Sequence, residues 1–158
     1  MVIAKTEHGK VIGGYTPLHW VASATGEYRA DKTDRSFLFS LSLNEKYELV
    51  RPMNTIYCRS DFGPTFGGGY DLHISNSCQN NTYSHSDFPH SYNNGKYKNN
   101  AETYRKFHGN SEGTNMKIKE WEVFKVNFTE DKVIQEPSLK AESSEEADES
   151  PEDLFRTI

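Results

Sequence analysis

The sequence predicts a mainly β protein, built as a two-sheet antiparallel β-sandwich with a few short helices and a disordered acidic C-terminal tail. Apolar residues along most of the chain recur with a period of two, which is the spacing of a half-buried strand. Proline, asparagine or glycine bounds most of these alternating runs, as expected for strands joined by turns. Two packed antiparallel sheets are the simplest way to bury one face of so many short strands.

The first two predicted strands form a hairpin. Val2–Thr6 and Lys10–Thr16 are alternating runs, and Gly9 between them can adopt the left-handed conformation that a short hairpin requires. The next run, Ser36–Leu43, predicts a core-facing strand whose buried side carries Phe37, Phe39, Leu41 and Leu43.

The remaining body of the chain predicts more strands and little helix. Further strands are expected over Tyr47–Arg51, Asn54–Arg59, Tyr70–Ser75 and Met116–Val126. The alternation changes phase near Glu120, which predicts a β-bulge there. Asn100–His108 is the candidate helix, and Thr16–Ala24 is expected to form a short turn beside Trp20.

The segment from Asn76 to Asn115 is polar and unusually long for a loop inside a compact domain. Two interpretations remain open. Either part of the segment is mobile, or it packs through its aromatic residues, which are Tyr83, Phe88, Tyr92, Tyr97, Tyr104 and Phe107.

Charge separates an acidic tail, residues 137–158, from the rest of the chain, in which we expect one folded domain over residues 1–128. The tail has seven acidic and two basic residues and so carries a charge of −5, equal to the net charge of the whole chain. Its few apolar residues cannot offset the entropy of ordering, so we expect disorder and either a solubilising or a phosphorylation-regulated role. Residues 1–136 are balanced, with 16 acidic and 16 basic residues, and have no basic stripe, which argues against nucleic acid as a partner.

The chain shows no sign of secretion or membrane insertion. Met1–Thr6 lacks the apolar run of a secretory signal, and no later segment is long and apolar enough to span a bilayer. We therefore expect a cytoplasmic protein in which Cys58 and Cys78 are free thiols.

Motifs for bound cofactors are weak. The run Gly67–Gly69 could suggest a phosphate-binding loop, but no Lys-Ser or Lys-Thr follows it and the next element is a strand. Metal ligands could come from a scattered set, but its spacing matches no known closed site: Asp71, His73, Cys78, His85 and His90. The sequence predicts neither a cofactor nor a metal.

Two acids in the last strand are the best candidates for acid–base chemistry. Glu120 and Glu122 are two residues apart in a strand, so their side chains are expected on the same face. Such a pair can catalyse proton transfer when one pKa is raised. The favoured interpretation is structural: one glutamate binds backbone amides of the glycine-rich loop, and the other faces solvent.

The most informative stretch is Phe62–Ile74, F-G-P-T-F-G-G-G-Y-D-L-H-I, in which three glycines allow positive φ or a close approach by another backbone. It resembles the G-P-x-F-G-x-x-x-D-L signature of TLDc domains, through Gly63, Pro64, Phe66, Gly67, Asp71 and Leu72. Three further blocks follow that family's order: Ile12–Pro17, which contains Gly13 and Gly14, then Ser36–Leu41, and Glu120–Phe124 with Glu120 and Glu122.

The resemblance implies a noncatalytic protein-binding domain. TLDc proteins are associated with protection against oxidative damage and with binding the vacuolar proton-pumping ATPase, and no agreed reaction is attached to them. The helical segment that precedes the Ile12–Pro17 block in the family has no counterpart, so we expect a domain that is incomplete at its N-terminus.

Two other functions remain open. One is a hydrolase or a thiol antioxidant enzyme that uses Glu120, Glu122 or Cys58. The other is a lectin-like sandwich whose tyrosine, tryptophan and asparagine residues bind sugar, an alternative that rests on composition alone.

Overall fold

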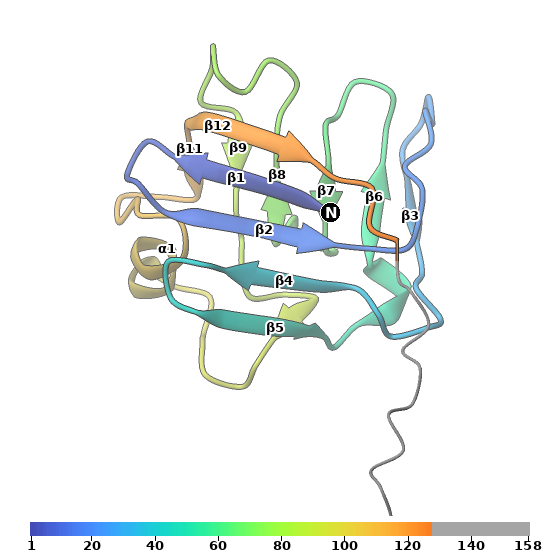
Figure 1. Cartoon of the computed structure of the whole chain (residues 1–158), viewed down its shortest axis with the longest axis horizontal. Helices are drawn as coiled ribbons and strands as arrows, with labels where there is room; N and C mark the ends of the chain where they lie inside the picture. The colour runs from blue at the N-terminus through green and yellow to red at the C-terminus, as the bar shows by residue number, and fades with distance from the viewer. Residues whose placement is uncertain (128–158) are drawn as a thin grey trace, which may run out of the picture. The chain divides into compact units, whose positions relative to one another are not determined.

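The computed structural model describes residues 1–127, and these residues form two six-stranded antiparallel sheets (Figure 1). In spatial order, the first sheet contains β10 (Tyr92–Asn93), β5 (Glu45–Leu49), β4 (Phe37–Ser40), β2 (Val11–Tyr15), β1 (Val2–Thr6) and β12 (Ile118–Val123). The second sheet contains β11 (Asn115–Met116), β9 (Ser84–His85), β8 (Leu72–His73), β7 (Thr65–Phe66), β6 (Ile56–Cys58) and β3 (Glu27–Arg29).

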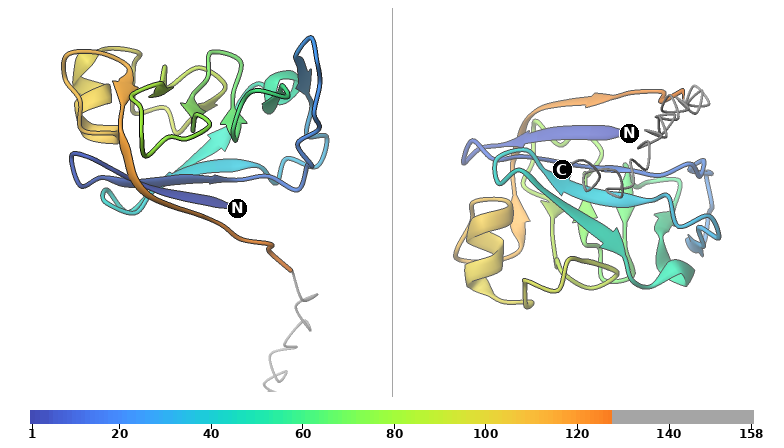
Figure 2. Two further views of the ribbon diagram at one scale, coloured as in Figure 1. Left: turned by 90° about the horizontal axis from the view of Figure 1, so that it is seen from above. Right: turned by 60° about the horizontal axis from the view of Figure 1, so that its bottom comes forward.

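The predicted β-sandwich is confirmed, with two short helices beside it. These are α1 (Ala101–Phe107) and the 3-10 helix η1 (Pro52–Asn54). Figure 2 shows the sheets as two layers with α1 at one end. Within residues 1–127, no helix has both the length and the apolar character that crossing a bilayer requires. The predicted tail at residues 137–158 lies outside the described residues.

Aromatic and aliphatic side chains from both sheets form one core. Fully buried members are Ile12, Leu38, Tyr47, Ile56, Phe66, Leu72, Phe88, Tyr92 and Phe107. Helix α1 joins this core through Phe107, whose ring stacks on that of Phe88 with centroids 4.7 Å apart. The helix begins after Asn100, whose side chain accepts the N–H of Thr103 at 3.0 Å and so satisfies an otherwise free amide.

The predicted hairpin at the start of the chain is confirmed. Gly9 has a φ of +75°, and its N–H donates to the carbonyl of Thr6 at 3.0 Å. The strand that closes the chain's body, β12, pairs with β1, and the register between them shifts where Lys5 faces Glu120 and Thr6 faces Ile118. Lys119 is therefore an extra residue, which accounts for the phase change predicted near Glu120.

The prediction for Ser36–Leu43 was wrong in both length and phase. Strand β4 ends at Ser40, a turn follows, and Leu41 is 59% exposed. The residue that faces the core is Leu38, whereas Phe37 and Phe39 lie on the outer face of the sheet. Both faces of β4 carry apolar side chains, so alternation alone could not identify the face that meets the second sheet.

The polar segment Asn76–Asn115 packs through its aromatic residues, which settles the choice between the two interpretations. It contributes β9, β10, α1 and β11, and the side chains of Phe88, Tyr92 and Phe107 are fully buried. Tyr83 is the exception, since it is exposed.

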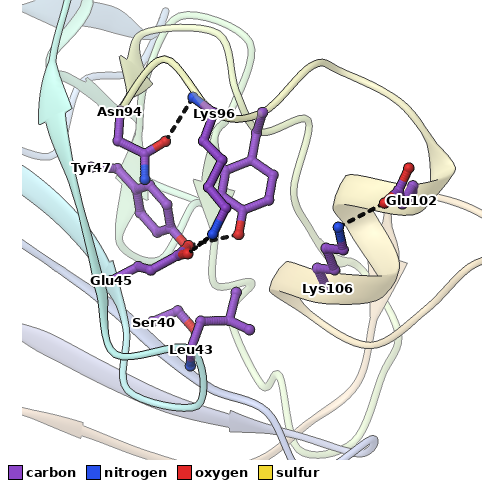
Figure 3. Close-up of polar contacts among 9 residues, drawn as sticks. Ser40, Leu43, Glu45, Tyr47, Asn94, Lys96, Glu102 and Lys106 are labelled. Carbon is purple, nitrogen blue, oxygen red and sulfur yellow. Dashed lines mark hydrogen bonds and ion pairs between the residues drawn. The ribbon is translucent and has the colours of Figure 1, made fainter.

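The half-buried carboxylate of Glu45 holds part of this segment against the first sheet (Figure 3). Glu45 in β5 accepts hydrogen bonds from the hydroxyls of Tyr47 at 2.9 Å and Tyr97 at 2.7 Å, and it forms an ion pair with Lys96. Burial opposes ionisation of Glu45, but the hydrogen bonds from Lys96, Tyr97 and Tyr47 outweigh it and lower the pKa. The carboxylate thus holds the loop around Lys96 against β5.

Candidate functional site

The glycine-rich stretch forms a tight turn between β7 and β8, and side chains fill the space that its missing Cβ atoms leave. Gly67 has a φ of +84°, and a Cβ there would overlap Oδ2 of Asp71. A Cβ on Gly68 would lie 2.5 Å from Nδ2 of Asn54, and one on Gly69 would lie 2.9 Å from Cγ of His90. The close approach was predicted correctly, but at these positions the neighbours are side chains and not another backbone.

Gly63 is the position in this stretch where a backbone does approach. A Cβ on Gly63 would overlap the carbonyl oxygen of Ile74, whose N–H donates to Pro64 at 2.9 Å. The Gly63-Pro64 pair therefore fixes the end of β8 against the beginning of β7.

Asp71 is fully buried and connects this turn to a distant loop. Its carboxylate accepts the backbone N–H groups of His90 and Ser91, the latter at 2.8 Å. The hydroxyl of Ser91 accepts the N–H of Gly68 at 2.7 Å, which closes the arrangement. We call these residues the glycine–aspartate junction: Gly67, Gly68, Gly69, Asp71, His90 and Ser91.

The electrostatics of Asp71 agree with a structural role. Burial raises the pKa of Asp71 to about 7, and the N–H groups of Ser91 and His90 only partly oppose this shift. A carboxyl with such a pKa suits acid–base catalysis. However, Asp71 is enclosed and both of its oxygens already accept protein N–H groups, so a substrate could not reach it.

The two glycine-containing sequence blocks meet in the core. A Cβ on Gly14 would lie 2.7 Å from Cζ of Phe66 and 2.7 Å from Cδ2 of Leu38, so the missing side chain lets the second sheet approach β2. On the opposite face of β2, a Cβ on Gly13 would overlap the ring of Phe39. Leu72 lies beside Phe66 in the register of β8 and β7 and is also fully buried.

Glu120 and Glu122 lie on the exposed edge strand β12, away from the junction. Glu120 forms an ion pair with Lys5 at 3.0 Å and its side chain is 69% exposed. The prediction that one of the two glutamates binds the glycine loop is wrong, because the loop amides have other acceptors. The N–H of Gly67 donates to Thr55 at 3.0 Å, and that of Gly68 donates to Ser91.

The two cysteines are free thiols, as predicted, and both are buried. Cys58 is fully enclosed in β6, and burial raises the pKa of Cys78, which disfavours its thiolate. Neither environment favours a reactive nucleophile.

The histidines considered as metal ligands are only partly brought together. The rings of His73 and His85 lie 5.0 Å apart, whereas His90 belongs to the junction with Asp71. Among residues 1–127, no group of three or more histidine, cysteine, aspartate or glutamate side chains is arranged to hold a metal ion.

Sequence reasoning missed a second buried aspartate. Asp31 accepts hydrogen bonds from the N–H and hydroxyl of Thr33 at 2.8 and 2.6 Å, and from those of Ser36 at 2.9 and 2.7 Å. Burial alone would raise its pKa, but the donors on Thr33 and Ser36 outweigh burial and lower the pKa to about 2. The Asp-x-Thr spacing, which favours a local side-chain turn, is the signal that could have found it.

Comparison with known proteins gives one match. A family model described as the TLDc domain matches residues 1–127, which is the whole described part of the chain. No curated protein and no solved structure matches significantly.

Proposed function

Because the chain belongs to the TLDc family, we propose that it is a noncatalytic protein-binding domain linked to oxidative-stress resistance and to the vacuolar proton-pumping ATPase. The support is that the signature residues have structural roles and are separate from the exposed residues. The signature residues Gly14, Phe66, Asp71 and Leu72 hold the scaffold together, and none of them faces an accessible site.

The observation that carries the proposal is the apolar surface at β12. Trp121 is 40% exposed and Val123 60%, and their side chains lie on the same face of the strand because the two residues are two positions apart. Scattered apolar side chains are normal on a protein surface, but an exposed aromatic side chain beside an exposed aliphatic one is typical of protein-binding sites.

The enzymatic alternative has weaker support. Cys58 is enclosed, so a peroxide could reach it only after local opening. Glu120 is exposed and paired with Lys5, and among the described residues neither it nor Glu122 hydrogen-bonds a histidine, serine or cysteine that could complete a catalytic set.

The test is capture of proton-pump subunits by the tagged full chain in cells. We expect subunits of the vacuolar ATPase to copurify with the chain, and cells that express it to survive peroxide better than cells that do not. Trp121→Lys should reduce capture, and Leu41→Lys is the matched control because Leu41 is an exposed apolar residue in a different part of the surface. The absence of pump subunits from the wild-type capture would contradict the vacuolar link.

A further inference from the structure

Strand β12 is the outer strand of the first sheet, with β1 on one side and no other strand of the described residues on the other (Figure 1). Phe124 and Met1 exchange hydrogen bonds, each 2.8 Å long, at the end of this pair. Because an antiparallel ladder alternates, Glu122 and Glu120 also point their backbone groups toward β1. Trp121 and Val123 therefore point theirs outward.

The side chains of these two outward residues continue the row that faces the core. In the register of the pair, Val123 lies opposite Val2 and Trp121 opposite Ala4. Val2 and Ala4 are buried, whereas Trp121 and Val123 are substantially exposed. An added strand with apolar side chains on this face would cover them, and removing their apolar area from water would stabilise the complex.

The outer face of the same strand is acidic. Glu122 forms no ion pair with another described residue, whereas Glu120 forms an ion pair with Lys5. Residues of an incoming strand that lie opposite these glutamates would have to be basic to gain from the contact, because like charges placed opposite each other are destabilising.

One end of the open edge is already closed. The side chain of Gln79 donates to the carbonyl of Lys119 at 3.1 Å. The free stretch is therefore short and centres on Trp121 and Val123, each of which offers one N–H and one C=O.

A second copy of the chain fits this edge poorly in two of its three central registers. Two-fold pairing centred on Trp121 would place Glu120 opposite Glu122, and pairing centred on Glu122 would place that carboxylate opposite its own copy. Pairing centred on Val123 would instead place Glu122 opposite Phe124, so the acidic outer row disfavours self-association in two of the three registers.

We propose that β12 binds an extended segment of a partner protein in which apolar and basic residues alternate, adding it to the first sheet as a further strand. This inference rests on the proposed protein-binding function and specifies how binding occurs. Backbone hydrogen bonds at Trp121 and Val123 provide attachment, and the acidic and apolar rows select the sequence.

The probe for the test is a short blocked peptide that alternates lysine and valine, compared with a peptide that has glutamate in place of lysine. The full chain is titrated with fluorescently labelled peptide, and amide hydrogen exchange is followed by NMR. We expect the lysine peptide to bind better and to slow exchange at the amides of Trp121 and Val123. The amide of Glu122 already donates toward β1 and should change little.

Two variants separate the backbone from the charge. Val123→Pro removes an outward N–H but no bond to β1, so it should fold and weaken binding by about tenfold or more, whereas the control Val123→Ala keeps the N–H. Glu122→Lys should weaken the lysine peptide by roughly fivefold and strengthen the glutamate peptide.

Several results would overturn the inference. These are equal binding by Val123→Pro and wild type, equal binding of the two peptides, protection of the Trp121 and Val123 amides in the free chain, or self-association that Val123→Pro abolishes. If the pump is captured but Val123→Pro and Val123→Ala capture it equally, the strand-addition inference fails and the proposed function stands. If the lysine peptide binds as expected but no pump subunit is captured, the vacuolar link fails.

Discussion

The carboxylate of Asp71 accepts the backbone N–H of Ser91 at 2.8 Å, and this contact links the two sheets. Ser91 also accepts the N–H of Val50 through its carbonyl at 2.8 Å, just after β5 of the first sheet. Asp71 itself comes directly before β8 of the second sheet. Changes around Asp71 should therefore affect the stability of the whole sandwich and not only the local turn.

The steric role of Gly67 can be separated from its backbone conformation. Gly67 and Gly95 have similar positive φ values, +84° and +78°, but a Cβ on Gly67 would overlap Asp71 whereas one on Gly95 meets nothing within 4 Å. We expect Gly95→Ala to lower the free energy of unfolding by about 1 kcal/mol, and Gly67→Ala by about 2–4 kcal/mol, in urea titrations. Equal losses would show that the junction tolerates a methyl group.

The sequence was sufficient to predict the sandwich but not the orientation of every strand. The alternation of the first hairpin and the glycine turn at Gly9 are local signals, and both predictions are confirmed. The face that Leu38 presents depends on which side of β4 the second sheet covers, and this is not encoded within the strand itself. The Gly13 and Gly14 pair held that information, since the smallest side chains mark where rings from both faces approach β2.

The site could be predicted only in part for a similar reason. The glycine stretch showed that something must come close, but the partners Asn54 and His90 come from other parts of the chain. The partner of Glu120 is Lys5, at the opposite end of the domain's sequence, and a short motif cannot indicate such pairing. Asp31 differs, because its donors on Thr33 and Ser36 are local and the pattern was present in the sequence.

Asp71 should make the protein less stable as the pH rises. Its pKa is about 7 in the folded protein, above its ordinary value of 3.8. Between these values the folded state retains a proton that the unfolded chain has lost, so the free energy of unfolding falls by up to about 1.4 kcal/mol per pH unit. We expect Asp71→Asn to remove this dependence. At pH 4 the unfolding free energy of this variant should be about 1–3 kcal/mol lower than that of the wild type, because the amide NH₂ faces a backbone donor.

The measurement is the difference in unfolding free energy between wild type and Asp71→Asn across pH 4–8. A difference that stays constant over this range would mean that the Asp71 carboxyl is ionised throughout. Asn54 in η1 provides a comparison because it packs against the same turn: Asn54→Ala alters packing against Gly68 without altering a titrating group.

His108 should have the opposite effect on the pH dependence. Its ring is fully buried, neither ring nitrogen has a hydrogen-bond partner among the described residues, and burial lowers its pKa to about 4. As the pH falls from 6.5 toward 4, the unfolded chain gains a proton that the folded state excludes, so this contribution to stability is lost. His108→Leu should reduce the loss of unfolding free energy between pH 6.5 and pH 4. At pH 7.5 it should change the unfolding free energy by less than about 1.5 kcal/mol. If the loss of stability at acid pH were unchanged in this variant, another group would cause it. The first candidate is His73, whose pKa is also lowered to about 4.

The two cysteines provide a direct test of the antioxidant alternative. Cys58 and Cys78 are both buried, so peroxide should be consumed no faster by the folded wild-type chain than by Cys58→Ala, Cys78→Ala or the double variant. Labelling by a thiol reagent should be slow in buffer and fast in urea, because it requires unfolding or local opening. If Cys58→Ala abolished peroxide consumption while Cys78→Ala retained it, and both variants melted cooperatively, Cys58 would be a catalytic thiol and the noncatalytic proposal would be wrong.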